Sequence, residues 1–242
     1  MSELRDHRNY FVFDGVPSTD FELFVNGNRT FDAPDADINA VTVPGKSGDL
    51  IRFDNRYSNG TVEYDSWIMD NMRVNLRNLR SFLLSRTTYC RLEDTYHPDE
   101  FRLAYYSGGL SASVDFENTL AQFTLSFSCK PQRFLKTGEQ KVTGTGTIYL
   151  ENPSYFPSKP LIRIYGNGTL TVGSATITVS HNVDTYIDID CELMDAFTGH
   201  KNRNADIETN VNGYITIPPG RVGILKTSGI TSFEITPRWY YL

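Results

Sequence analysis

One stretch of the chain, residues 72–85, has apolar residues at helical spacing. They recur at steps of four and three residues, which places them along one side of an α-helix: Met72, Leu76, Leu79 and Leu83. Asp70 precedes the stretch and is expected to cap the helix N-terminus, because its carboxylate can accept the free N–H groups of the first turn. Outside the apolar stripe lie Arg73, Arg77 and Arg80, which either meet another subunit or form an ordinary solvated face.

Most of the remaining first half is interpreted as strands and turns. Residues 122–128 place Phe123, Leu125 and Phe127 on one face, as expected for a half-buried strand. Shorter strands are predicted at 11–13 and at 38–43, the second of which ends at Pro44 and Gly45. The first half therefore reads as a sheet that carries one helix.

The second half shows no helical period. Short strands with turn residues about every ten positions indicate an antiparallel β-sandwich; they are predicted at 161–165, 169–172, 176–179, 185–191, 214–217, 222–225 and 232–236. Residues 137–147 are rich in Gly and Thr and are interpreted as a linker, or as a polar strand that leaves one domain for the other. The predicted domains are 1–136 and 137–242, and the fold class is mainly β, α+β followed by all-β.

The last five residues, 238–242, hold three aromatic side chains and a leucine. Pro237 cannot donate to a strand ladder, so the last long strand should end near Thr236. A free apolar tail would be a sticky patch in water, and we therefore expect these residues to be packed.

Composition narrows the classes of function. The 242 residues are enough for two domains, and 39% hydrophobic with 21% charged residues is ordinary for a globular protein. A net charge of −6 argues against a wrapped nucleic acid or an anionic membrane as partner, because both need a basic footprint. The charged first ten residues lack an apolar signal region, and no apolar run approaches the roughly 20 residues that span a bilayer. Synthesis in the cytoplasm without membrane insertion is expected.

The cysteines Cys90, Cys129 and Cys191 are far apart and odd in number. Their spacing fits neither a metal site nor a disulfide framework, so each is expected to act as a small buried apolar residue.

Two acidic groups are candidate metal sites. The segment from Glu93 to Glu100 also contains Asp94, His97 and Asp99, but its spacing matches no known metal loop and favours a solvated turn. Asp184, Asp188 and Asp190 would share one strand face, with Ile187 and Ile189 opposite. These three carboxylates would either bind calcium or form the wet face of a sandwich strand.

Catalytic motifs are weak throughout. There is no Gly-x-Ser-x-Gly nucleophile elbow, and Gly45-Lys-Ser47 lacks the upstream glycine and the strand–loop–helix context of a P-loop. Gly166-Asn-Gly168 is a turn pair rather than a dinucleotide fingerprint. Paired carboxylates of the glycosidase kind rank low. The sequence thus predicts a non-enzymatic protein with no catalytic residue, no cofactor-binding residue and no metal ligand.

Several strings, in the same order along almost the whole chain, resemble phage distal tail proteins. They are Phe11-Val-Phe-Asp-Gly15 with Ser18-Thr-Asp-Phe21, Val43-Pro-Gly-Lys-Ser-Gly-Asp49, Tyr57-Ser-Asn59, Tyr89-Cys-Arg-Leu-Glu-Asp94 with Tyr96-His-Pro-Asp-Glu-Phe-Arg102, Phe127-Ser-Cys-Lys-Pro-Gln-Arg-Phe134, Leu150-Glu-Asn-Pro153, Pro160-Leu-Ile-Arg-Ile-Tyr-Gly166, Ile187-Asp-Ile-Asp-Cys191 and Glu234-Ile-Thr-Pro-Arg-Trp239. Within this set, His97 precedes the proline and Phe101 stands at the family's aromatic position.

The resemblance implies a barrel-like N-terminal ring domain of which six copies assemble, and a C-terminal sandwich similar to galectins and carbohydrate-binding modules. It implies a virion tail-tip location, in a phage with a long non-contractile tail. The implied partners are the tail tube protein, a tail-associated lysin or fibre-like protein, and receptor-binding or side proteins on the C-terminal domain. The genome would pass through the ring, and the net charge of −6 then predicts a neutral to acidic channel, because a basic wall would retain DNA.

An alternative function is a carbohydrate-binding module that contacts the host wall. Such modules present an exposed aromatic side chain to a sugar ring, and the candidates are Tyr155, Tyr165, Tyr186 and Tyr214. Fold alone does not establish this activity.

Overall fold

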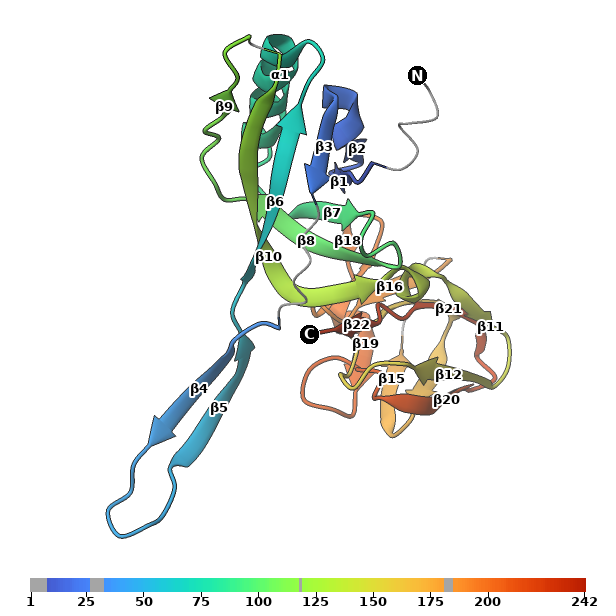
Figure 1. Cartoon of the computed structure of the whole chain (residues 1–242). Coiled ribbons are helices and arrows are strands. Elements are labelled where there is room, and N and C mark those ends of the chain that lie inside the picture. Colours follow the sequence, from blue (N-terminus) through green and yellow to red (C-terminus); the bar gives the residue numbers. More distant parts are fainter. Residues whose placement is uncertain (1–7, 27–32, 118, 181–184) are drawn as a thin grey trace. The chain divides into compact units, whose positions relative to one another are not determined.

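Figure 1 shows the computed structural model, which describes residues 8–26, 33–117, 119–180 and 185–242. The chain forms two compact units, Met1–Arg133 together with Leu242, and Phe134–Tyr241. Strands dominate both, and α1 (Met72–Leu84) is the α-helix of the described residues, so the predicted mainly β fold is confirmed. The division falls three residues before the predicted boundary at 136/137. That the two units are separable domains stays a prediction.

The first unit is built on one large antiparallel sheet with the strand order β2-β1-β7-β8-β10-β6-β3, and β9 pairs with β10. Its elements are β1 (Phe11–Phe13), β2 (Val16–Pro17), the 3-10 helix η1 (Ser18–Phe21), β3 (Leu23–Asn26), β6 (Gly60–Ile68), β7 (Cys90–Asp94), β8 (Glu100–Tyr106), β9 (Ser113–Val114) and β10 (Ala121–Leu135).

The core of this unit follows from the alternation along β6 and β10. Phe123, Leu125 and Phe127 are buried on one face, as predicted, and Leu125 and Phe127 pair in register with Tyr64 and Val62. The ring of Phe11 stacks on Tyr64 at 5.3 Å between ring centroids and meets Phe127 edge-on at 5.5 Å. Large rings in such offset and edge contacts stabilise the sheet beyond their burial.

Helix α1 covers this core with its predicted stripe. Met72, Leu79 and Leu83 are buried and Leu76 is half-buried against them. The expected cap at Asp70 is wrong. Asn71 occupies the N-cap with φ 46° and makes no side-chain capping bond, while the Asp70 carbonyl accepts a bond from the Asn75 side-chain amide at 2.8 Å. The left-handed turn at Asn71 reverses the chain out of β6, so the Asp70 carboxylate does not reach the first helical N–H groups.

β4 (Ala36–Val41) and β5 (Leu50–Tyr57) form a two-stranded sheet of their own. The turn between them contains Gly45 and Gly48, both at positive φ, which a residue with a side chain adopts only with strain. We call this hairpin the ribbon (Figure 1).

The second unit contains two antiparallel sheets, ordered β11-β21-β13-β16-β17-β18 and β12-β20-β14-β15-β19. Its elements are η2 (Lys136–Glu139), β11 (Val142–Gly144), β12 (Ile148–Asn152), β13 (Leu161–Gly166), β14 (Gly168–Val172), β15 (Ala175–Val179), β16 (Ile187–Asp190), β17 (Asp195–Thr198), β18 (Lys201–Asn202), η3 (Asn204–Asp206), β19 (Ile207–Thr209), β20 (Gly220–Lys226), β21 (Ile230–Thr236) and β22 (Tyr240–Tyr241), which pairs with the end of β10.

Both sheets contribute to one buried cluster, which includes Ile162, Ile189, Phe233, Leu170 and Ile224. This is the predicted sandwich; its finer likeness to galectins stays a prediction. The strand expected at 214–217 is wrong: this segment makes only the isolated bridge between Ile217 and Ser158. Ile215 and Ile217 are nevertheless fully buried, because an extended segment can fill a core without joining a ladder.

The interpretation of residues 137–147 as a linker is also wrong. The alternative, a polar strand, is confirmed for part of the segment, because β11 pairs with β21 from Val142 to Gly144. A Cβ at Gly144 would overlap the ring of Phe233, and one at Gly138 would overlap the Trp239 backbone. The glycines are there because other parts of the chain approach closely, and not because the segment needs flexibility.

The segment is therefore expected to resist proteases. In a time course with trypsin, cleavage after Lys136 and Lys141 should come later than cleavage after arginines outside the two cores, such as Arg52 in the ribbon. Proteolysis requires local opening, but Lys136 begins the 3-10 helix η2, and Lys141 directly precedes the paired strand β11 and donates to Glu234 of β21. Mass spectrometry of the first fragments measures the order; an initial cut at Lys141 would contradict the assignment.

The C-terminal residues are packed as predicted, and β21 ends at Thr236. Trp239 is buried in the core of the second unit. Tyr240 stacks on Phe156 at 5.9 Å between ring centroids, and the Tyr241 hydroxyl donates to the Pro153 carbonyl at 3.2 Å.

Candidate functional site

The acidic segment from Glu93 to Glu100 forms a structural turn between β7 and β8. Asp94 accepts hydrogen bonds from the Tyr64 hydroxyl at 2.7 Å and from the backbone N–H of Tyr96 and His97 at 3.0 and 2.8 Å. The same carboxylate lies 3.0 Å from Nδ1 of His97. Its oxygens are therefore committed to shaping the turn. The described part of the chain holds no group of three or more His, Cys, Asp or Glu side chains arranged to bind a metal.

The second acidic group does not form a wet strand face. Asp188 and Asp190 are each 6% exposed, and Asp184 lies outside the described residues. Arg163 binds Asp188 through Nε and Nη2 at 2.6 and 2.8 Å, and Arg238 binds both oxygens of Asp190 at 2.8 Å. Fork-to-fork pairs of this kind satisfy a carboxylate without a metal ion.

Asp190 links stability to pH. Burial raises its pKa, but the hydrogen bond from Arg238, the Leu193 N–H and the arginine charge outweigh burial, so its pKa lies below the usual 3.8. The unfolded state then binds more protons in acid. This contribution to stability is present above about pH 4 and is lost as pH falls through the folded pKa.

The free energy of unfolding of the wild type is measured by urea unfolding at a series of pH values. It is expected to fall as the pH is lowered from about 5. Asp190→Asn should lower that free energy by about 1–3 kcal/mol at pH 7 and flatten its acid dependence. An Asp190→Asn variant with the wild-type slope would contradict the assignment.

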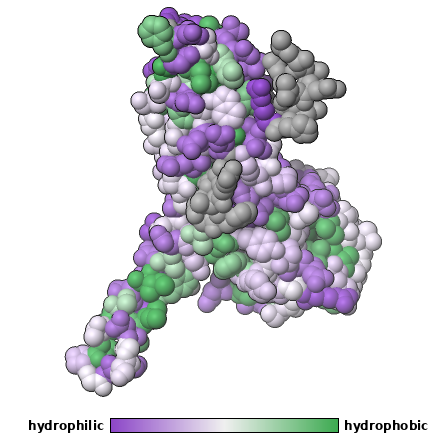
Figure 2. Space-filling model, in the orientation of Figure 1, coloured by the Kyte–Doolittle hydropathy of each residue, from purple (hydrophilic) through white to green (hydrophobic). Residues whose placement is uncertain are grey.

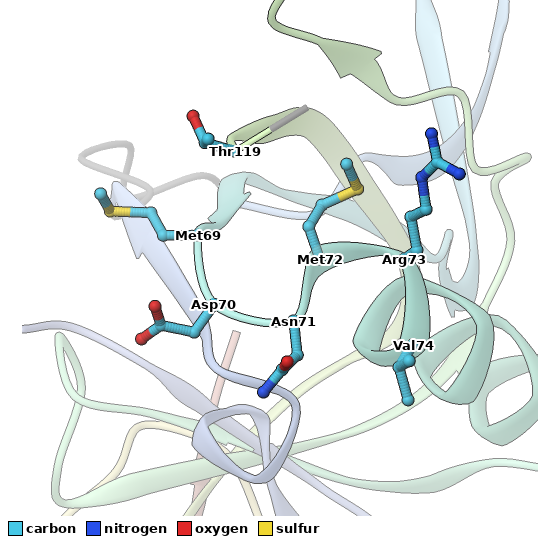
Figure 3. A pocket seen from close by; sticks show the side chains of 7 residues that line it. All are labelled: Met69, Asp70, Asn71, Met72, Arg73, Val74 and Thr119. Atoms are coloured by element: carbon cyan, nitrogen blue, oxygen red, sulfur yellow. The ribbon is translucent and has the colours of Figure 1, made fainter. Parts of the chain in front are cut away.

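An open hollow of about 550 Å³ lies where α1 begins. Figure 3 shows its lining side chains, among which Met69 and Met72 supply apolar surface and Asp70 and Arg73 supply charge. The hydroxyl of Thr119, also in the lining, donates to Asp115 at 2.6 Å. The lining holds no His, Cys, Lys or Ser side chain, and it indicates no particular chemistry.

The remaining sequence signals have structural explanations. Gly45, Lys46 and Ser47 lie in the turn at the tip of the ribbon, with no helix after them. Burial raises the pKa of Cys129 to about 11 and that of Cys191 to about 12, so both thiols stay protonated at neutral pH. They are buried, as predicted, whereas Cys90 is half-buried.

The four candidate tyrosines separate into different places. Tyr165 and Tyr186 lie together, with 6.3 Å between ring centroids. Tyr155 is 89% exposed, and the hydroxyl of Tyr214 donates to the Asn204 side-chain oxygen at 2.8 Å. Tyr149, which the sequence reasoning did not select, is 60% exposed beneath the guanidinium of Arg221.

The ribbon carries an exposed apolar face. Ile38 pairs in register with Phe53, and Ala40 pairs with Ile51, which places these four side chains on one side of the two strands. Ile38, Ile51 and Phe53 are 53%, 68% and 38% exposed. Tyr57 extends the same side, with its ring 5.4 Å from that of Phe53. Figure 2 shows the apolar surface along the ribbon. We call these five residues the ribbon apolar face.

A second surface lies on β6 and β10, opposite the core. Thr124 donates to Asp65 at 2.9 Å, and Ser126 donates to Glu63 at 3.1 Å. We call these four residues the hydroxyl–acidic face. On the outer side of α1, Arg73, Arg77 and Arg80 are exposed, as the helical pattern predicts.

The sequence pattern did not predict the ribbon apolar face. It predicted a strand at 38–43, which starts two residues later than β4, but it predicted no strand at the position of β5. The signal was present, since Ile51 and Phe53 alternate with Arg52 and Asp54. Alternation indicates a strand, but it does not say whether the apolar side faces a core or solvent.

The fold is that of a phage distal tail (Dit) hub protein. The crystal structure of the SPP1 Dit protein, described as a paradigm of the hub adsorption apparatus in phages infecting Gram-positive bacteria, covers 97% of this chain and 99% of its own, with a TM-score of 0.72 and 15% identity. Chains of the phage P2 baseplate in its activated conformation, with Ca and with Sr, cover 94% of this chain and 97% of their own at 10% identity, with TM-scores of 0.51 and 0.52.

At this identity the likeness shows the fold, and it confirms the Dit-like resemblance at that level. No family model and no curated protein sequence matches the chain. None of the helices described is long and apolar enough to cross a membrane.

Proposed function

We propose that this protein is a structural distal tail protein, six copies of which form a ring in the virion of a phage with a long non-contractile tail. The ring joins the tail tube to the tail tip or baseplate and the adsorption apparatus. The Dit-like fold over nearly the whole chain supports this role. The solved structures that share the fold are a phage hub protein and chains of a phage baseplate, which also supports it. The proposed function is assembly and not catalysis.

The observation that carries the proposal is the ribbon apolar face. An isolated two-stranded hairpin is at best marginally stable in water, yet this one presents large apolar side chains on one side. Burying such surface contributes about 25 cal/mol per Å². A neighbouring copy of the chain is the proposed cover, because identical contacts repeated around a closed ring bury every ribbon in turn.

The hydroxyl–acidic face is proposed to line the channel. Its charged groups are the carboxylates of Glu63 and Asp65, with serine and threonine hydroxyls between them. DNA releases counterions when it binds lysine and arginine, so a wall of this composition lets the genome pass without retaining it. A ring whose channel is lined mainly by Lys and Arg would contradict this part of the proposal.

The proposed partners are the tail tube protein on one side of the ring and a tail-associated lysin or fibre-like protein on the other. Receptor-binding or side proteins are proposed on the second unit, whose galectin-like character belongs to the same proposal. The exposed arginines of α1 provide a cationic surface for one of these protein contacts.

Native mass spectrometry of the purified protein tests the proposal. The expected species has six times the 27.4 kDa mass of the chain. Dissociation on dilution, followed by mass photometry, would give the assembly midpoint. A protein that stays monomeric at all concentrations, or that closes with another number of copies, would refute the six-copy ring.

A further inference from the structure

A fully exposed aromatic side chain projects from the turn between β9 and β10. Phe116 is 102% exposed, and Glu117 beside it is also exposed. The turn that carries them is closed by Asp115, whose carboxylate accepts the N–H groups of Thr119 and Leu120 at 2.7 and 2.8 Å and the Thr119 hydroxyl at 2.6 Å. We call Phe116 and Glu117 the knob.

The base of the knob is held closed although the knob itself is exposed. The Asp115 N–H also donates to the Leu120 carbonyl at 3.1 Å, so main-chain and side-chain bonds close the turn together. The bond from the Leu120 N–H, and after it the bond from the Thr119 hydroxyl, lowers the pKa of Asp115. Its carboxylate therefore stays ionised and keeps the turn closed at neutral pH. A side chain that projects from a closed turn loses less freedom when a partner covers it.

Stability of the single chain does not account for Phe116. A fully exposed side chain buries no apolar surface and so adds nothing to folding through burial. Single exposed apolar residues are ordinary, whereas several that gather at one place mark a contact site. The open hollow at the start of α1 adds Met69, which is 54% exposed, and Val74, which is 48% exposed. Knob and hollow lie at the same end of the first unit, because Thr119 of the knob's turn lines the hollow (Figure 3).

The hollow has the size and the lining to receive an aromatic side chain. Its volume of about 550 Å³ falls within the roughly 300–1,000 Å³ of pockets that hold small molecules. Met69, Met72 and Val74 supply its apolar lining. Methionine side chains adapt their shape to what they contact, and their sulfur atoms pack favourably against aromatic rings. The chain therefore carries both an exposed aromatic side chain and a hollow that suits one.

The charges of the two surfaces are complementary. Glu117 gives the knob a negative charge, and Arg73 supplies a positive charge to the lining of the hollow. Asp70 also lines the hollow, but its carboxylate and the Arg73 guanidinium lie on different sides of it (Figure 3). A knob that enters with Glu117 towards Arg73 avoids Asp70. Complementary charges of this kind fix the direction in which two surfaces meet.

We propose that the knob of one copy of the chain enters the hollow of the next copy in the ring. This contact rests on the proposed ring and adds to the cover of the ribbon apolar face. Knob and hollow are different surfaces, so each copy gives one and receives one, and head-to-tail contacts without a rise along the axis close into a ring. Their position at the same end of the first unit keeps that rise small. The contact is too small to hold two copies by itself, so it supplements the ribbon.

Cysteine cross-linking of the full-length protein tests the contact. Phe116→Cys and Met69→Cys are combined in one chain, which is assembled and treated with a short bismaleimide. Cross-links from each copy to the next should give a ladder of up to six chains on a denaturing gel. Chains that carry only one of the two cysteines, mixed before assembly, should give two-chain bands, which a cross-link within one chain cannot produce. The controls are the wild type and Tyr155→Cys with Met69→Cys, because Tyr155 is 89% exposed but belongs to the second unit; neither should give a ladder.

Native mass spectrometry of the same samples separates the possible failures. A six-copy ring without cross-links would overturn this contact and leave the proposed function standing. Absence of the ring would overturn both. A ladder that stops at two chains would show that two copies exchange knobs as a pair, and it would overturn the head-to-tail contact.

A charge exchange tests how the knob enters the hollow. Phe116→Ser should raise the midpoint concentration of ring assembly about 10–100-fold, because it removes the aromatic ring that the contact buries. Glu117→Arg should raise the midpoint about tenfold, and adding Arg73→Glu should restore it. Adding Arg80→Glu instead should not, because Arg80 lies on the same helix but outside the lining of the hollow. A wild-type midpoint for Phe116→Ser, or equal rescue by both second changes, would overturn the proposal.

Discussion

Aspartate at both Ile38 and Ile51 is expected to convert the assembled ring into monomers that keep the folded structure of the single chain. Both side chains lie on the ribbon apolar face and are more than half exposed in the single chain. Replacing them therefore removes almost no internal packing, and substitutions at such positions usually change stability by less than about 0.5 kcal/mol. In the ring, each aspartate would be buried without a partner in an apolar contact.

Unpaired buried charge is costly, and two in each repeated contact should weaken association at least about 100-fold. The matched control is Asn39→Asp with Arg52→Gln, which also lowers the net charge by two. These residues pair with each other on the opposite side of the ribbon. The control should assemble normally in native mass spectrometry. Hexamers of the Ile38→Asp/Ile51→Asp variant at the wild-type midpoint would show that the ribbon apolar face is not the contact.

Truncation after Pro237 is expected to prevent cooperative folding of the second unit. Removing Arg238 leaves Asp190 buried without its charged partner, which typically costs about 3–5 kcal/mol. Removing Trp239 empties a site in the core of this unit, which costs a further roughly 3–5 kcal/mol. Together these losses are comparable to the whole stability of a typical domain, about 5–15 kcal/mol.

Calorimetry and near-ultraviolet circular dichroism of the full-length and truncated proteins measure this effect. Tyr241→Phe is the control, because it removes only the hydroxyl that donates to Pro153 and should cost about 1 kcal/mol. If the truncated protein kept the melting temperature within about 3 °C of the wild type, the terminal residues would not contribute as the contacts indicate.

The sequence predicted those elements whose pattern depends on local periodicity. The α1 stripe and the alternation of Phe123, Leu125 and Phe127 were confirmed because one buried face imposes its own period. The packing of the terminal aromatic residues followed in the same way from their hydrophobicity.

Features that depend on distant parts of the chain were not predicted. Gly138 and Gly144 look flexible in the sequence, but they are small because Trp239 and Phe233 approach them. Asp188 and Asp190 look like solvated acids because their partners, Arg163 and Arg238, are 25 and 48 residues away. No local pattern could pair Tyr165 with Glu234 across two strands that are 69 residues apart.

The two ends of the second unit lie next to each other. The Leu135 N–H donates to the Trp239 carbonyl at 2.9 Å, and the Arg238 N–H donates to the Gly138 carbonyl at 2.8 Å, so its first and last residues are bonded together. A unit whose two ends meet can be exchanged as a cassette, because its replacement needs only a matching pair of ends. Recombination between related genes would therefore give this chain a different second unit while leaving the first unit intact, and an engineer would graft a foreign domain at the same junction.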